Sequence, residues 1–598
     1  MNTKNKVLSN VIYVLSQTWK LEQRILFIIF FQVIIGVVVP LITIYLPTAA
    51  LSGILGFLGV NQLFFRIIIL VLALIACNII NAYMDATYET YLLNNKIHFL
   101  TALFRKRMEL DYSFIESGEG ENLYQHVMAT LLNEDQGISG MLRMLGALFS
   151  RICNIVLYIG IIALLEFELM AILLISSVIH FAIMSKTLER QYNQKDAWTD
   201  IDKKKDYLMN IIRHESSIKD IKIFSMQNWL SRMANTLIID RIFWVKKIAQ
   251  YDFFMAMIDI KLLIVRDVFS YFFIFQAILS QRIEIYDFVF FFGAITTFSI
   301  FTTELTNALA QISQKSREVD DIRCYLERDV PNHEEQKIIS SVLQNVHLCV
   351  ELINVSFRYS NETPYILENL NLKIFKGEKI ALVGENGAGK TTLVKLICGL
   401  YKPTKGKILI NGLDISEQSQ TYIGSLFAAV FQDIHILPLS AVDNIAFDSE
   451  YKDIEIEDCI QIAGLDDIFS DIHTPVTKSF HKEGVVLSGG QEQKLVLARA
   501  FYKMRYQNAS ILVLDEPTAA LDPLAELQLY ENYSTLVQNK TSLFISHRLS
   551  STQFCDRIVM LDAGKIIEMG SHQELMKMKG KYKEMYEIQG KQYKNTIK

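Results

Sequence analysis

The sequence lacks several features that would point to common classes of protein. It has no C-x-x-C pair, and its seven cysteines are scattered, so neither a zinc framework nor a disulfide framework is expected. The formal net charge of −5 gives no argument for nucleic acid as a partner. The first 20 residues are polar and mixed, and no small-residue cleavage site follows them. We therefore expect no cleavable signal peptide.

The chain is instead long and rich in apolar residues. The 598 residues exceed what one hydrophobic core holds, so at least two domains are expected. Hydrophobic residues make up 51 % of the chain, and the mean hydropathy is +0.24. These values are high for a soluble enzyme and indicate that part of the chain lies in lipid.

Six apolar stretches before residue 315 are long enough to cross a bilayer, for which a helix needs about 20 residues. They are Ile25–Leu46, Leu63–Tyr83, Met141–Leu165, Leu169–Met184, Phe253–Leu279 and Tyr286–Leu309. Lysine and arginine precede the first stretch and follow the second and fourth, whereas Pro47–Gln62 has no charged residue. By the positive-inside rule, both termini are expected in the cytoplasm.

Two long connections between the stretches are expected on the cytoplasmic side. They span about Met84–Gly140 and Ser185–Asp252 and are rich in helix formers, which predicts helices that run on from the spans. Each has a break in its middle, at Asp111–Asn122 and at His214–Phe224. A short cross-piece or a plain solvated turn would fit either break.

Polar residues inside the stretches are costly in lipid and usually face a bundle interior or an aqueous cavity. The candidates are Asn78, Asn81, Asn154, His180, Asp259, Lys261, Arg266, Asp267 and Glu304. Asp259 and Arg266 are seven residues apart, hence on one helix face, and could line a transport path. Structural pairing with neighbouring helices, or a place near the cytoplasmic mouth, is the alternative.

The second half of the sequence differs in composition from the first. Residues 315–347 are polar and charged and include Pro331, as expected of the exit of the last helix plus a linker. Val350–Arg358 then alternates as a strand, and a soluble α/β domain is expected to the end of the chain. The predicted organisation is a cytoplasmic segment at 1–24, a transmembrane permease domain at 25–314, a linker at 315–347 and a nucleotide-binding domain at 348–598.

Gly384–Thr392 fits the phosphate-binding pattern G-x-x-x-x-G-K-[ST]. Glycines let backbone N–H groups face one point, to which the following helix presents its positive N-terminus. A strand at Lys379–Val383 and a helix at Thr392–Cys398 supply the expected context. The residues predicted to bind nucleotide here are Gly384, Glu385, Asn386, Gly387, Ala388, Gly389, Lys390, Thr391 and Thr392.

Further motifs stand in order around this loop. They are Tyr359 about 25 residues before it, Gln432 in Phe431–Asp433, Leu487–Gln491 with the sequence Leu-Ser-Gly-Gly-Gln, the apolar run Ile511–Leu514 before Asp515 and Glu516, Ala520–Pro523, and His547 in Ser546–Arg548. With them the domain resembles the nucleotide-binding domain of ABC transporters. With the six spans, nearly the whole chain resembles a bacterial ABC exporter half-transporter.

The resemblance implies a fold and a set of roles. The fold is an α-helical transmembrane bundle of six spans with long cytoplasmic extensions, followed by an α/β P-loop ATPase domain. ATP and Mg²⁺ are the implied cofactors. Lys390, Glu516 and His547 would be catalytic, with Glu516 polarising the attacking water and His547 holding the γ-phosphate or ordering the site. Thr391 and Gln432 would bind Mg²⁺, with Asp515 near the metal.

The remaining implied roles concern the nucleotide. Tyr359 would stack on adenine. Ser488 and Gly490 would close on ATP bound to a second chain, and Gly489, Gln491 and Asp522 would also bind nucleotide. One departure is the segment His481-Lys-Glu-Gly484, where the resemblance predicts an acid at the position of Lys482.

The sequence thus predicts ATP-driven export of an amphiphilic substrate (a peptide, a drug-like molecule or a lipid) across a bacterial cytoplasmic membrane by alternating access. An ATP-gated channel or a membrane-anchored regulator is the alternative, and the fused order of permease and ATPase disfavours an importer. The expected partners are membrane lipid and a second half-transporter, more simply an identical chain than a different one. Only about 24 residues precede the first span, so we expect no domain that processes a leader peptide.

Overall fold

The chain folds into two units, which a computed structural model describes in eight stretches. These are residues 3–55, 59–193, 195–213, 215–330, 348–360, 362–478, 480–517 and 540–595. The first unit comprises Met1–Glu109 and Gly118–Asp329, and the second comprises Leu110–Ser117 and Val330–Lys598. The short segment at 110–117 therefore belongs with the C-terminal half of the chain.

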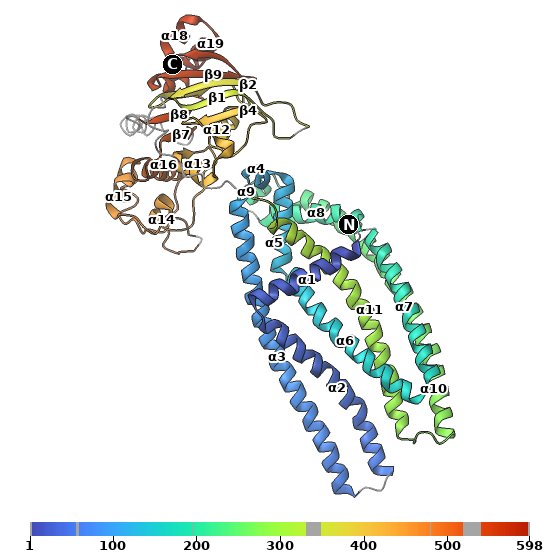
Figure 1. Cartoon of the computed structure of the whole chain (residues 1–598). Coiled ribbons are helices and arrows are strands. Elements are labelled where there is room, and N and C mark those ends of the chain that lie inside the picture. Colours follow the sequence, from blue (N-terminus) through green and yellow to red (C-terminus); the bar gives the residue numbers. More distant parts are fainter. Residues whose placement is uncertain are drawn as a thin grey trace. The chain divides into compact units, whose positions relative to one another are not determined.

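The first unit is helical throughout its described residues, with long helices side by side (Figure 1). The helices are α1 (Thr3–Leu21), α2 (Arg24–Leu55), α3 (Val60–Glu109), α5 (Gly118–Leu132), α6 (Gly137–Leu165), α7 (Phe167–Asn193), α8 (Lys195–Arg213), α9 (Glu215–Ile223), α10 (Gln227–Leu279) and α11 (Asp287–Leu326). Six helices are long and apolar enough to cross a membrane, namely α2, α3, α6, α7, α10 and α11. The prediction of six spans is confirmed.

Two of the spanning helices are much longer than a bilayer is thick. α3 has 50 residues and α10 has 53, which at 1.5 Å per residue gives about 75–80 Å. A bilayer core is about 30 Å thick, so most of each helix extends beyond the lipid. The structure thus contains the helical extensions that the polar connections predicted.

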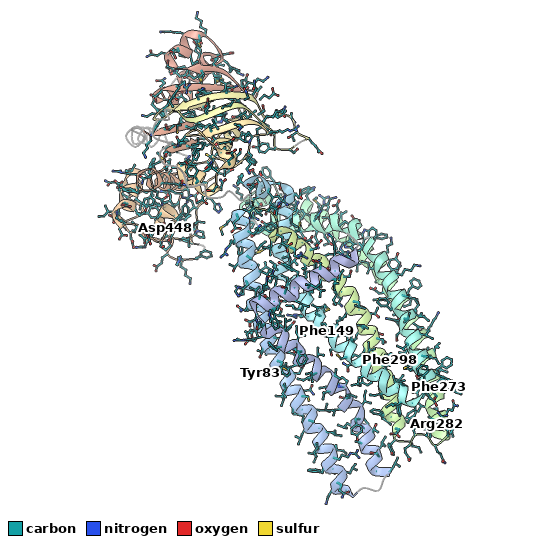
Figure 2. The ribbon with its side chains drawn as sticks, in the orientation of Figure 1. Tyr83, Phe149, Phe273, Arg282, Phe298 and Asp448 are labelled. Carbon is teal, nitrogen blue, oxygen red and sulfur yellow. The ribbon has the colours of Figure 1, made fainter. Side chains whose placement is uncertain are left out.

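An apolar core joins α6, α7, α10 and α11. Tyr158, Ile162 and Phe298 are almost fully buried in it, and Phe273 packs against them. Figure 2 labels Phe298 and Phe273 among these helices. Because lipid tails are themselves apolar, close packing of this kind is what holds such helices together.

Several polar side chains in the spans pair with neighbouring residues. His180 Nδ1 lies 2.7 Å from Asp259 Oδ1, and the Arg266 guanidinium donates to Asp267 Oδ1 at 2.6 Å. Arg151 and Glu304 form an ion pair of 3.0 Å between α6 and α11. Structural pairing is therefore observed for these residues, and a role in a transport path stays a prediction.

The stretch predicted as the exit of the last helix plus a linker begins as helix. α11 continues to Leu326, and its charged residues are paired instead of solvated. Lys315 contacts Glu318 at 3.3 Å, and Arg323 donates to Asn10 Oδ1 of α1 at 2.7 Å. α1 itself was not predicted, and its contacts explain why this polar stretch is helical. Residues 331–347 of the predicted linker lie outside the described residues.

The second unit is an α/β domain, as predicted. Its helices are α4 (Tyr112–Glu116), α12 (Lys390–Ile397), α13 (Gln420–Leu426), α14 (Ala441–Ala446), α15 (Asp453–Ile462), α16 (Gly489–Arg505), α18 (His572–Met578) and α19 (Lys581–Asn595), with 3-10 helices η2 (Ile415–Glu417) and η3 (Leu549–Phe554). Its strands are β1 (Leu348–Phe357), β2 (Leu367–Phe375), β3 (Lys379–Val383), β4 (Lys405–Ile410), β5 (Leu413–Asp414), β6 (Phe427–Val430), β7 (Ile511–Asp515), β8 (Thr541–Ile545), β9 (Arg557–Asp562) and β10 (Lys565–Gly570).

Two sheets organise this unit. The smaller sheet is antiparallel, in the order β2-β1-β4-β5. The larger sheet has the order β10-β9-β3-β8-β7-β6 and is parallel except for β10. β7 and β8 are buried at every position, which explains the apolar runs Ile511–Leu514 and Leu543–Ile545 within them. Since β3, β7 and β8 are parallel neighbours, the loops that follow them meet at one edge of the sheet.

We predict that Gly406→Ala destabilises the smaller sheet. Gly406 lies at the start of β4 with a φ of +83°, and an added Cβ would come within 2.4 Å of the carbonyl oxygens of Ile353 and Asn354. The expected loss is about 1–3 kcal/mol, seen as faster hydrogen exchange of β1 and β4 amides. Gly424→Ala is the control, because no atom lies within 4 Å of its added Cβ. Unchanged exchange in Gly406→Ala would contradict the prediction.

Candidate functional site: an ATP site at the edge of the large sheet

The loop between β3 and α12 forms the centre of the candidate site. At Gly384 an added Cβ would lie 2.1 Å from the Leu561 carbonyl oxygen, so only glycine permits this close approach to β9. The loop ends at Gly389, the N-cap residue of α12. It therefore lies at a helix N-terminus, where unpaired N–H groups and the helix dipole favour an anion such as phosphate.

Lys390 lies within the curve of this loop. Its ammonium group donates to the carbonyl oxygens of Gly384 and Glu385, both at 3.0 Å, and the residue is buried. Burial lowers the pKa of Lys390, while the nearby carboxylates of Glu516 and Asp515 act in the opposite direction. Its position places a cation where phosphate groups would bind.

Thr391 and Asp515 place two oxygen atoms that could bind a metal ion beside the loop. Thr391 Oγ1 donates to Asp515 Oδ2 at 2.9 Å, and burial raises the pKa of Asp515. Asp515 Oδ1 is buried and has no hydrogen-bond partner among the residues that the structure describes. Mg²⁺ takes hydroxyl and carboxylate oxygens of this kind, so the donor set fits this metal.

Glu516 follows β7 in a left-handed backbone conformation, with a φ of +53°. Such a conformation is unfavourable for a non-glycine residue and persists only where its surroundings hold it. Its N–H donates to the Ile545 carbonyl of β8 at 3.1 Å, and its carbonyl accepts from Gln493 Nε2 at 3.2 Å. These two bonds fix the direction in which the carboxylate points.

The carboxylate of Glu516 contacts two predicted site residues. Glu516 Oε1 lies 2.5 Å from His547 Nε2, and Gln432 Nε2 donates to Glu516 Oε2 at 3.4 Å. Burial and the positive charge of Lys390 lower the pKa of His547, whereas Glu516 raises it. The net direction is downward from the ordinary value of histidine, which favours the neutral imidazole.

Tyr359 lies at another side of the loop. Its hydroxyl is 3.1 Å from Thr392 Oγ1, and its ring packs edge-on against Phe357 and Tyr401. Half of the residue is exposed, at 50 %. The ring is therefore held on one side and accessible on the other, as stacking on a base would need.

The motif Leu487–Gln491, called the signature below, lies at the start of α16. Ser488 Oγ accepts from the Gln491 N–H, and Gln491 Oε1 accepts from the Ser488 N–H at 2.8 Å, which is a capping box. Within the described part of the chain, no hydrogen bond or ion pair joins Ser488–Gln491 to Gly384–Thr392. Asp522 and the surrounding Ala520–Pro523 lie outside the described residues.

Comparison with known proteins agrees with this geometry. Residues 367–519 match the protein family described as ABC transporter. This part of the chain therefore belongs to the ABC transporter family. It is 30 % identical over 410 residues to the nisin transport ATP-binding protein NisT of Lactococcus lactis subsp. lactis, covering 67 % of this chain and 65 % of that protein. It is 32 % identical over 287 residues to the ATP-dependent lipid A-core flippase of Escherichia coli (strain K12), covering 48 % of each.

These matches span less than two thirds of the relatives' own length. A solved structure of a bacterial Atm1-family ABC exporter with ATP bound shares the fold of nearly the whole chain. Its TM-score is 0.76 at 21 % sequence identity, covering 95 % of this chain and 98 % of the other. The chain thus has the fold of an ABC exporter, with six helices in its described residues that are long and apolar enough to cross a membrane and an ABC transporter domain at residues 367–519.

The break predicted at Asp111–Asn122 contains a short helix of this transporter that packs on the ATP-binding domain. In α4, the Tyr112 ring lies 5.7 Å from that of Tyr401, and Glu116 pairs with Lys395 of α12 at 3.1 Å. The second break, at His214–Phe224, contains α9, which belongs to the first unit.

Sequence reasoning missed Gln493, which holds the backbone of Glu516. Gln493 is 4 % exposed and lies two residues after the signature, within an otherwise apolar helix face. The one feature that could have indicated this role is a glutamine at a buried position of α16. The sequence alone does not show that the position is buried. In the altered segment 481–484, Lys482 and Glu483 are exposed in a turn that the Gly484 N–H closes on the His481 carbonyl at 3.1 Å.

We predict that the imidazole of His547 titrates below pH 6.5. Lys390→Met should raise this pKa, because it removes one of the two causes of the downward shift. Histidine NMR signals of the labelled chain, assigned by their loss in His547→Ala, would measure it. Lys395→Met is the matched control and should leave the pKa unchanged. A wild-type pKa at or above 6.5 would show that Glu516 raises the pKa of His547 by more than burial and Lys390 lower it.

Proposed function

We propose that the chain is an ATP-hydrolysing exporter that moves an amphiphilic substrate across a cytoplasmic membrane by alternating access. The observation that carries this proposal is the contact between His547 and Glu516 beside the phosphate-binding loop. It joins a candidate base to a polar partner at the place where a γ-phosphate would lie. The same polypeptide carries six helices that could span the membrane, and ATP hydrolysis would drive their rearrangement.

The proposed chemistry uses groups that the structure brings together. Lys390 and the N-terminus of α12 neutralise phosphate charge, Glu516 polarises the attacking water, and His547 holds the γ-phosphate or orders the site. Thr391 and Gln432 would hold Mg²⁺ directly, with Asp515 nearby. When bound, Mg²⁺ supplies further neutralisation of the charge on the phosphates.

We propose that the site is completed by a second chain. Ser488 and Gly490 have no bond to the loop of their own chain in the described residues, which supports a role toward ATP held by a partner. Gly489, Gln491 and Asp522 belong to the same proposal. The hydrolytic motifs and the signature are intact in one sequence, which favours a homodimer over pairing with a different half-transporter. The mass of the purified chain in detergent, with its ATPase activity alone, distinguishes the two.

The orientation and substrate class are further parts of the proposal. Both termini lie in the cytoplasm, from the distribution of basic residues around the spans. An amphiphilic substrate is supported by the names of the relatives, which include a nisin transport protein and a lipid A-core flippase. A screen of peptides, drug-like molecules and lipids for stimulation of the ATPase would identify the class.

We predict that Glu516→Gln abolishes ATP turnover and transport but retains ATP binding and favours the closed dimer. The amide keeps the size of the side chain and cannot polarise water as a carboxylate does. Steady-state ATPase assays and ATP-binding measurements on the full chain check this. Glu457→Gln is a matched control, because Glu457 is an exposed carboxylate on α15. ATPase near the wild-type rate in Glu516→Gln would contradict the role of Glu516.

Transport itself is tested in inside-out vesicles. ATP-dependent uptake of a stimulating compound against its gradient supports export, whereas flux that is only downhill and ATP-gated supports a channel.

We predict that Lys395→Glu uncouples ATP hydrolysis from transport. It replaces the ion pair between α4 and α12 with two like charges, which should lower the transport per ATP hydrolysed by about twofold to tenfold. The double reversal, Glu116→Lys with Lys395→Glu, restores an opposite-charge pair and should recover most of the coupling. A double variant no better than Lys395→Glu alone would show that the pair does not transmit motion.

A further inference from the structure

The last described helix of the chain, α19, presents one row of side chains to the segment that carries His547. Tyr582, Tyr586 and Gln589 are spaced i, i+4 and i+7, which places them on one face of the helix. All three contact residues within 547–553, a segment that starts two residues after β8 and contains most of η3.

The two tyrosines attach the helix firmly to η3. Tyr582 is fully buried, and its hydroxyl lies 3.3 Å from Thr552 Oγ1 and 2.8 Å from His572 Nδ1. The Tyr586 hydroxyl accepts from Gln553 Nε2 at 2.6 Å. The first turn of α19 is held separately, since Glu568 accepts from the backbone N–H groups of residues 581 and 582. The position of α19 is thus fixed at several points before Gln589 is reached.

Gln589 bonds to the backbone on both sides of Arg548. Its Nε2 donates to the His547 carbonyl at 2.7 Å, and its Oε1 accepts from the Leu549 N–H at 3.0 Å. Both hydrogen-bonding ends of the amide are therefore used on one short stretch of loop. A side chain that satisfies two backbone groups in this way restricts the loop far more than a single bond would.

The geometry points to Gln589 as a positioning residue for His547. The imidazole lies 2.5 Å from Glu516, and Glu516 is held independently by Gln493 and by β8. The relative placement of the two side chains therefore depends on what fixes the backbone of His547, and Gln589 supplies two of those bonds. A displacement of about 1 Å in a catalytic group can lower a rate on the order of a hundredfold. This inference rests on the proposed ATP hydrolysis.

The test compares two variants of Gln589 in the full-length chain in lipid nanodiscs. Gln589→Met keeps the length of the side chain and loses both bonds. Gln589→Glu keeps the acceptor for the Leu549 N–H and turns a carboxylate oxygen toward the His547 carbonyl. We expect each variant to lower kcat of ATP hydrolysis about tenfold, because the imidazole shifts relative to Glu516, with KM for ATP within twofold of wild type.

Ile588→Ala is the matched control. It changes the adjacent residue, whose side chain is exposed, and should keep both kinetic constants. ATP affinity measured in a Glu516→Gln background should be the same with and without Gln589→Met, because the nucleotide-binding loop is untouched. A role in overall stability alone would instead lower the thermal midpoint and affect ATP binding together with turnover.

The outcomes separate this inference from the proposed function. A wild-type chain that does not hydrolyse ATP would overturn the proposed function itself. A wild-type chain that hydrolyses ATP, together with Gln589 variants of unchanged kcat, would overturn only the positioning role. A rise in KM at constant kcat would also overturn it, since the bonds would then serve nucleotide binding.

Discussion

The parallel hydrogen bonding of β7 to β8 is the constraint on which the candidate site depends. Asp515 pairs with Ile545 in this register, so the residues just beyond both strands emerge at the same edge. Glu516 is the first residue after β7, and His547 is the second after β8. Their contact at 2.5 Å follows from a register of buried backbone bonds, and a slip of one residue would turn both side chains to the wrong face.

The site combines several groups that are unfavourable in isolation. Lys390 is buried, Glu516 has a left-handed backbone conformation, and Asp515 Oδ1 is buried without a partner among the described residues. Each of these costs free energy that the surrounding apolar sheet must offset. Such a concentration is typical of a site that is arranged for a charged ligand, and it agrees with the match to the ABC transporter family.

The sequence predicted those parts of the molecule that are encoded locally. The phosphate-binding loop, the buried strand before Glu516 and the six spans each depend on a continuous pattern of residues, and the structure contains all of them where they were expected. Gln493 and Gln589 were missed because each acts on a residue 23 or more positions away, through a contact that only the tertiary fold creates. How far the charged end of α11 continues could not be predicted for the same reason, since its partners lie in α1.

The short helix α12 connects nucleotide binding to the cross-piece α4. It begins at Lys390, next to the phosphate-binding loop, and its last turn carries Lys395, which pairs with Glu116. Eight residues of helix span only about 12 Å, so α4 contacts a helix that starts beside the loop. The Tyr112 and Tyr401 rings pack beside this pair and add an apolar contact that does not depend on charge. α4 follows directly on the end of α3, a spanning helix of 50 residues. The contact between α12 and α4 therefore lies next in the chain to a helix that is long and apolar enough to cross a membrane.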